Sequence, residues 1–121
     1  MILVDSSIWI DHFRQREARL VSLLENEAVA IHPFIIGELA CGNLKNRKEI
    51  LSLLSSLTMN PVAHHAEVMQ FIATTKLFGK GLGWIDIHLL ASCLLNQTKI
   101  WTLDKRLGAA AVRLKISYTI M

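Results

Sequence analysis

The sequence contains few of the residues that build disulfide frameworks or zinc sites. Its two cysteines, Cys41 and Cys93, do not form a Cys-x-x-Cys pair, and its five histidines show no His-x-x-x-His spacing. Zinc sites in proteins usually carry such spacings, so zinc ligation is disfavoured. We expect both thiols to be buried and reduced within apolar helices.

Long hydrophobic runs and a secretory signal are also absent. The longest uncharged segment, residues 50–63, contains Ser, Thr, Asn and Pro and is too short to span a bilayer. Met1 is followed by three apolar residues and Asp5 rather than by a basic region. The sequence therefore predicts a cytoplasmic protein with no membrane partner.

A strong charge of either sign is the third absence. The chain has 13 Lys and Arg against 10 Asp and Glu, which leaves a net charge of +3 at pH 7. A charge this small permits nucleic acid as a partner but does not demand it. Hydrophobic residues make up 52% of the chain. This high content favours either a parallel sheet buried on both faces or an apolar surface that a partner covers.

The chain does contain a short apolar run near each end that stops on an aspartate. Residues 2–4 precede Asp5, and residues 99–103 precede Asp104. Short runs of β-branched and large apolar residues are typical of buried strands. We expect further strands over residues 28–31, briefly near residues 60–61, and over residues 116–119. Capping residues and helical spacing predict helices over residues 6–13, 17–26, 33–42, 47–57, 64–78, 85–96 and 105–114.

This alternation of strands and helices predicts an α/β fold. We expect a single domain over residues 1–121, with a mainly parallel sheet of four to five strands flanked by helices on both sides. In such a sheet, ligands bind just beyond the carboxyl ends of the strands. Asp5 and Asp104 are therefore expected to face one crevice.

Four acids stand in apolar surroundings, where a charge is costly: Asp5, Glu38, Asp86 and Asp104. Each has a simple structural explanation, because Asp favours helix N-termini and Glu38 suits a salt bridge. Ser6 or Ser7 offers a further helix cap after the first strand. Helix capping does not explain, however, why strands at both ends of the chain stop on an acid.

Glu38 interrupts an otherwise apolar helix, so we expect its carboxylate to be buried and to need a partner. If these acids face one crevice about 5 Å apart, each pair repels by roughly 3 kcal/mol at an effective dielectric near 20. A divalent cation removes this repulsion, and oxygen ligands select Mg²⁺ or Mn²⁺. Such an ion activates a bound water and stabilises a phosphodiester transition state. The sequence therefore predicts phosphodiester hydrolysis, with one or two ions.

Four motifs in order along the chain resemble a known family. They are Asp-Ser-Ser after the first strand, Ile-Gly-Glu-Leu around Glu38, Gly-Leu-Gly-Trp-Ile-Asp-Ile-His-Leu-Leu-Ala-Ser around Asp86, and Trp-Thr-Leu-Asp-Lys-Arg-Leu around Asp104. Together they resemble the PIN domain, and most closely the VapC-type toxins of bacterial type II toxin-antitoxin systems. The resemblance implies a Mg²⁺-dependent endoribonuclease that cleaves RNA, forms a homodimer and is silenced by a cognate antitoxin protein.

The resemblance also implies roles for individual residues. Asp5 and Asp86 match the principal metal ligands, and Glu38 and Asp104 match the acids that complete the catalytic pocket directly or through water. Ser7 and Thr102 match hydroxyl positions that orient a carboxylate or a water. Two structural alternatives remain open: Ser7 could cap a helix, and Thr102 could be present because threonine favours strand structure.

Other functions fit the sequence less well. A receiver domain needs a phosphoacceptor aspartate in a middle strand, and residues 40–60 contain none. A phosphatase with an aspartate nucleophile needs a second acid where Ser7 stands. A binding module that holds RNA or protein and keeps the acids for structure stays open. The three tryptophans are expected in the core or an interface rather than on RNA, His88 is expected to pack, and Gly79, Gly81 and Gly83 are expected to form a flexible connection.

Overall fold

A parallel four-stranded sheet forms the centre of the protein. The computed structural model describes residues 1–119. The strand order is β3-β2-β1-β4, and every pairing is parallel. The strands are β1 (Ile2–Val4), β2 (Val29–Ile31), β3 (Thr58–Met59) and β4 (Lys99–Trp101). The expected parallel α/β sheet is confirmed.

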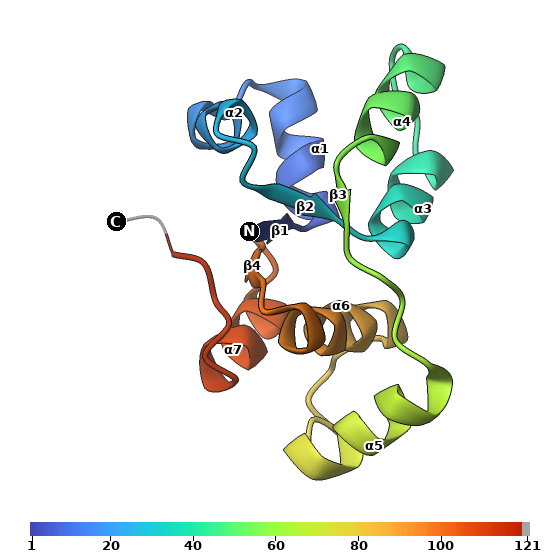
Figure 1. Cartoon of the computed structure of the whole chain (residues 1–121), viewed down its shortest axis with the longest axis vertical. Helices are drawn as coiled ribbons and strands as arrows, with labels where there is room; N and C mark the ends of the chain where they lie inside the picture. Colours follow the sequence, from blue (N-terminus) through green and yellow to red (C-terminus); the bar gives the residue numbers. More distant parts are fainter. Residues whose placement is uncertain (120–121) are drawn as a thin grey trace.

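Seven helices cover the sheet within residues 1–119. Figure 1 shows α1 to α4 on one side of the sheet and α5 to α7 on the other, as expected. Their bounds are α1 (Ser6–Arg14), α2 (Ala18–Glu25), α3 (Pro33–Cys41), α4 (Arg47–Ser55), α5 (His65–Thr75), α6 (Trp84–Asn96) and α7 (Lys105–Arg113). None of these helices has both the length and the apolar character that crossing a membrane requires.

The core lies on both faces of the strands. Leu3, Ala30 and Ile100 are buried at neighbouring positions of β1, β2 and β4, which explains why these strands are apolar without alternation. The helices add fully buried side chains to the same cluster, among them Leu20, Ile35, Leu89, Leu90 and Leu107.

Some boundaries differ from the sequence expectations. β3 lies at Thr58–Met59, just before the expected position, and both of its residues are exposed at the sheet edge. The expected strand over residues 116–119 reduces to a single bridge between Ile100 and Ser117 in the described chain. Helix α5 ends at Thr75 because Lys76 adopts a left-handed conformation, φ 57°. The expectation of two buried thiols is wrong for Cys41, which is exposed at the end of α3, whereas Cys93 is buried.

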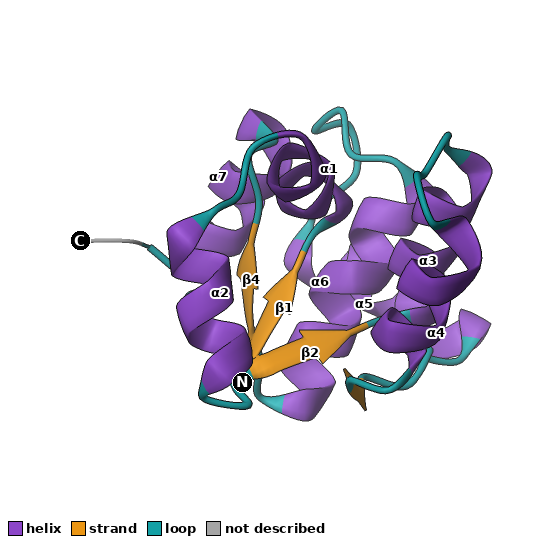
Figure 2. Cartoon of the chain, turned by 90° about the horizontal axis from the view of Figure 1, so that it is seen from above, coloured by secondary structure: helices purple, strands orange, loops and turns teal. Residues whose placement is uncertain are grey.

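The carboxyl ends of β1 and β4 lie side by side. The Asp5 backbone N–H donates to the Trp101 carbonyl at 2.9 Å, so the pairing continues to the point where both strands end. Figure 2 shows the arrowheads of β1 and β4 pointing to the same edge, where α1 and α7 begin. This edge brings the residues around Asp5 next to the residues around Thr102.

Candidate active site

Asp5 is the centre of a hydroxyl network at the sheet edge. It is buried, and its carboxylate accepts from Thr102 Oγ1 at 2.7 Å and from Ser7 Oγ at 3.0 Å, both at Oδ2. Ser6 Oγ lies 3.5 Å from Oδ1. Asp5 occupies the N-cap position of α1, yet its side chain makes no capping hydrogen bond. Helix capping therefore does not explain this carboxylate.

The hydroxyls of Ser7 and Thr102 are themselves held in place by backbone donors. Ser7 Oγ accepts from the Leu103 N–H, and Thr102 Oγ1 accepts from the Asp104 N–H, each at 3.0 Å. The two hydroxyl oxygens lie 3.4 Å apart. Each hydroxyl accepts a backbone N–H through a lone pair and donates its one proton to Asp5. The network thus fixes the orientation of one carboxylate from both ends of the chain.

Ser6 joins a second acid to this network, a role that the sequence analysis missed. Its hydroxyl donates to Glu38 Oε1 at 3.3 Å and lies beside Asp5 Oδ1. One hydroxyl has one proton, so Ser6 donates to one of these two carboxylates at a time. The position of Ser6 in the Asp-Ser-Ser motif was the only sequence feature that pointed to this role. A serine at this position was equally consistent with a helix cap.

Glu38 is exposed on α3, so the expectation of a buried carboxylate is wrong. Ile35 and Leu39 pack into the core, whereas Gly37 and Glu38 lie on the open side of the helix. Partial burial of the carboxyl group still raises its pKa, and the charge of Asp5 raises it further. The hydrogen bond from Ser6 opposes this shift, and the charge of Asp86 adds to it.

Asp86 approaches the same edge from the first turn of α6. Its Oδ2 accepts from the Gly83 N–H at 3.2 Å, so Asp86 also stabilises the start of the helix. Burial raises the pKa of Asp86, whereas the Gly83 hydrogen bond lowers it. The charges of Asp104 and Asp5 raise it further. Asp86 therefore lies within electrostatic reach of two other acids.

Asp104 is the most peripheral of the four acids. It is exposed and caps α7, with Oδ1 accepting from the Leu107 N–H at 2.9 Å. Helix capping thus accounts for one oxygen of Asp104. The charge of Asp104 also raises the pKa of Asp86. The structure brings all four acids to one edge but orients only Asp5 entirely by side-chain hydroxyls.

This arrangement gathers oxygen donors of the kind that hard divalent cations prefer. Burial is the main cause of the raised pKa of Glu38 and of Asp86, and the charges of the neighbouring carboxylates raise it further. Within residues 1–119, no three His, Cys, Asp or Glu side chains lie close enough to hold one ion together. The residues that could contribute oxygen ligands to a hard cation are Asp5, Glu38, Asp86 and Asp104.

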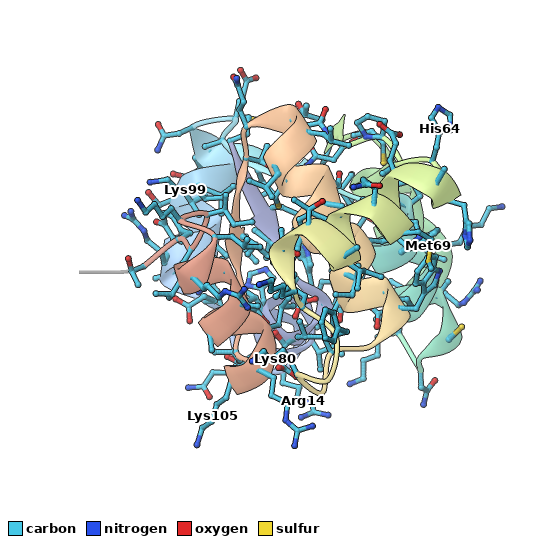
Figure 3. All side chains as sticks on the ribbon, turned by 90° about the horizontal axis from the view of Figure 1, so that it is seen from below. Arg14, His64, Met69, Lys80, Lys99 and Lys105 are labelled. Carbon is cyan, nitrogen blue, oxygen red and sulfur yellow. The ribbon has the colours of Figure 1, made fainter. Side chains whose placement is uncertain are left out.

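The glycine-rich loop before α6 contacts a neighbouring arginine. Gly81 has φ +76°, and an added Cβ would lie 2.7 Å from Nη1 of Arg106. The Arg106 side chain therefore packs directly against the loop backbone. Lys80 from this loop and Lys105 from α7 project toward the same edge of the molecule in Figure 3, whereas Lys99 lies far from them. Lys105 and Arg106 directly follow Asp104 in the sequence, so positive charge borders this acid.

Comparisons with known proteins identify the family of this chain. The PIN domain family model matches residues 2–113. Ribonuclease VapC32 from two strains of Mycobacterium tuberculosis, CDC 1551 and H37Rv, is 47% identical over 111 residues, which cover 91% of this chain and 90% of the relative. The crystal structure of PAE2754 from Pyrobaculum aerophilum shares the fold, with a TM-score of 0.64, 19% identity and 94% coverage of both chains. The chain therefore belongs to the PIN domain family and is of the VapC type.

Proposed function

We propose that this protein is a metal-dependent endoribonuclease that acts as the toxin of a toxin-antitoxin pair. The observation that carries the proposal is the Asp5 carboxylate, which no helix needs as a cap and which three serine and threonine hydroxyls surround. Glu38 and Asp86 lie within electrostatic reach of it. The relative named a ribonuclease supports RNA as the substrate.

In this proposal Asp5 and Asp86 are the principal ligands of Mg²⁺ or Mn²⁺, and Glu38 and Asp104 complete the pocket through water. The ion, when bound, supplies a more acidic water and charge stabilisation for phosphodiester hydrolysis. Ser7 and Thr102 keep the Asp5 oxygens aimed in one direction. Ser6 donates a hydrogen bond to Glu38 and so ties α3 to the start of α1.

The direct test is RNA cleavage by purified protein across a range of Mg²⁺ concentrations. Asp5→Asn is expected to lower the cleavage rate at least about 100-fold, a loss typical of removing a group that stabilises transition-state charge. Asp11→Asn is the matched control, because Asp11 is an exposed acid on the same helix. A chelator is expected to stop cleavage by the wild type. Metal-independent cleavage, or equal rates for Asp5→Asn and the wild type, would refute the proposal.

The alternative of a non-catalytic binding module has one observation in its favour. Asp86 and Asp104 do accept backbone hydrogen bonds at helix starts, as structural acids would. If the acids are only structural, no metal supports cleavage of RNA by the wild type. The cleavage assay therefore separates the two functions without a further variant.

We also propose that the antitoxin covers an apolar groove between α1, α2 and α4. The groove has a volume of about 200 Å³. Its lining residues are Trp9, His12, Phe13, Leu24, Ile50, Leu53, Leu54 and Leu57. Leu53 is 60% exposed there. Helix α1, which begins just after Asp5, lines one side of the groove with Trp9, His12 and Phe13. An amphipathic segment of the antitoxin fits such a surface.

Co-purification with the product of the adjacent reading frame tests this surface. Leu53→Asp is expected to release the antitoxin, because a charge enters the apolar groove. Leu95→Asp is the control, since Leu95 is 58% exposed on α6, outside the groove. Retention of the antitoxin by Leu53→Asp would contradict the proposed surface. The family resemblance also implies a homodimer. Light scattering on the same samples tests this, and the mass of a monomer would contradict it.

A further inference from the structure

One of the three tryptophans lies at the surface, beside the acids. Trp9 and Trp101 are 4% and 6% exposed and belong to the core, as expected from the sequence. Trp84 is 43% exposed and does not belong to the core. It is the first residue of α6, two positions before Asp86. A tryptophan this open leaves a large aromatic surface available for a ligand.

The indole of Trp84 is held in place by other rings. Its centroid lies 4.6 Å from that of His88 in an edge-to-face arrangement and 5.4 Å from that of His65. Behind His88, the Phe34 ring follows at 4.8 Å and His32 at 5.0 Å from Phe34. His32 and His88 are buried, so this row of rings runs from the interior to the surface. Trp84 is therefore supported from behind and needs little ordering when a flat ligand binds.

The row of rings and the acids share two helices. Phe34 precedes Glu38 by one helical turn on α3, so both side chains lie on one face of that helix. Trp84 and Asp86 both lie in the first turn of α6, on different sides of a helix end that is roughly 10 Å across. A flexible strand that crosses this end can place a phosphate near Asp86 and a neighbouring base on Trp84.

Positive charge completes a surface suited to single-stranded nucleic acid. Lys80 lies in the loop that precedes Trp84, and the Arg106 guanidinium packs on Gly81 of the same loop. Proteins that bind single strands combine aromatic side chains, on which bases stack, with basic groups that follow the backbone. Two imidazole rings, those of His65 and His88, lie next to the Trp84 ring, so its surroundings include polar groups that suit a base.

We propose that Trp84 is the stacking platform for an RNA base next to the phosphate that is cleaved. The proposal rests on the ribonuclease function proposed above. It adds a residue that binds the substrate without taking part in the chemical step. Trp84 is therefore a positioning residue, and its loss weakens RNA binding rather than the chemical step.

Tryptophan fluorescence provides a selective test, because Trp9 and Trp101 are buried. A short single-stranded RNA, added in the presence of a chelator to prevent turnover, is expected to quench the emission of the wild type. Trp84→Phe is expected to lose this quenching. Phe78→Ala is the control, since Phe78 is 64% exposed and lies outside the row of rings; its quenching and affinity are expected to match the wild type.

Affinity for a labelled RNA, measured by fluorescence anisotropy in the same buffer, gives the size of the effect. Trp84→Ala is expected to weaken binding by about 5- to 150-fold, because one stacked base contributes about 1–3 kcal/mol. Trp84→Phe keeps an aromatic ring and is expected to fall between Trp84→Ala and the wild type. An RNA with an abasic nucleotide at the stacked position is expected to bind the wild type and Trp84→Ala equally.

Cleavage kinetics separate this inference from the proposed function. With Mg²⁺, Trp84→Ala is expected to raise KM and to leave kcat within about threefold of the wild type, as loss of uniform binding does. No cleavage by the wild type refutes the ribonuclease function. Normal cleavage with equal KM and equal RNA affinity for Trp84→Ala and the wild type overturns the stacking role alone. If the antitoxin quenches the Trp84 fluorescence and RNA does not, Trp84 belongs to the protein interface. This result would also overturn the stacking role.

Discussion

Individual hydroxyl groups decide how the Asp5 carboxylate is presented. Thr102 makes the shortest of its hydrogen bonds, 2.7 Å to Oδ2, and also accepts from the Asp104 N–H. Hydrogen bonds to a charged group contribute more than those between neutral groups, and a buried partner left unpaired is costly. Thr102 therefore acts on the stability of the fold as well as on the geometry of the site.

Thr102→Val removes the hydroxyl and keeps the shape of the side chain. We expect the metal-free variant to lose about 1–3 kcal/mol of unfolding free energy, because Asp5 loses a donor and the Asp104 N–H loses its acceptor. Thr102→Ser keeps the hydroxyl and is expected to stay within about 1 kcal/mol of the wild type. Urea denaturation in a chelator measures both variants. Equal stability of the two would show that the hydroxyl contributes nothing.

At the scale of single elements, α3 depends on a buried histidine at its start. The Nδ1 atom of His32 accepts from the Phe34 N–H at 3.0 Å and caps the helix. Burial, followed by the charge of His88, lowers the pKa of His32 to about 4. Because a protonated Nδ1 cannot accept this hydrogen bond, α3 needs the neutral form of His32. Helix α3 carries Glu38, so the cap and the candidate site are linked through one element.

The lowered pKa of His32 predicts sensitivity to acid. The unfolded chain binds this proton near pH 6.5 and the folded chain near pH 4. The stability contribution of neutral His32 is therefore complete above about pH 6.5 and is lost as the pH falls toward 4. Between pH 7 and pH 5 we expect the wild type to lose about 2 kcal/mol more than His32→Asn, which keeps a capping oxygen. Urea denaturation at both pH values measures this difference, and equal losses would contradict it.

The elements also show what the sequence could and could not predict. The apolar runs of β1, β2 and β4 identified these strands because a parallel sheet buries both faces. The pattern placed β3 imprecisely because Thr58 and Met59 are exposed and carry no burial signal. The end of α5 was missed because Lys76 adopts a positive φ, which sequence patterns assign mainly to Gly and Asn.

The candidate site was predictable in part for the same physical reasons. Asp5 and Asp104 follow neighbouring parallel strands, so their proximity follows from the topology. The exposure of Glu38 was not predictable, because apolar residues flank it on both sides in the sequence and only the packing of α3 decides which face is open. Ser6 was missed because hydroxyl residues at a helix start usually act as caps.

At the scale of the whole molecule, two of the acids, Glu38 and Asp86, cost stability in the folded state when they are charged. The pKa values of Glu38 and Asp86 are raised in the folded state. The free energy of unfolding therefore falls as the pH rises through these folded-state pKa values. A bound divalent cation reverses this balance because it stabilises the deprotonated groups of the folded state only. Metal binding and global stability are therefore expected to be coupled.

Thermal unfolding with and without Mg²⁺ measures this coupling. At a concentration 100 times the dissociation constant, the ion is expected to stabilise the wild type by about 2.7 kcal/mol. Asp86→Asn removes a proposed ligand but keeps an acceptor for the Gly83 N–H. Without metal we expect this variant to be at least as stable as the wild type at pH 7, and with Mg²⁺ we expect it to gain much less. An equal gain in both proteins would place the ion elsewhere.

The pairing of β1 with β4 has a consequence for when the protein becomes able to act. Asp5 directly follows β1, but the Thr102 hydroxyl that orients it and the Trp101 carbonyl that anchors its backbone come from β4 and the residue after it, far from Asp5 in the sequence. A chain that ends before β4 carries Asp5, Glu38 and Asp86 and still lacks the partner strand that assembles them. The Asp5 carboxylate therefore gains its orientation only once β4 has paired with β1.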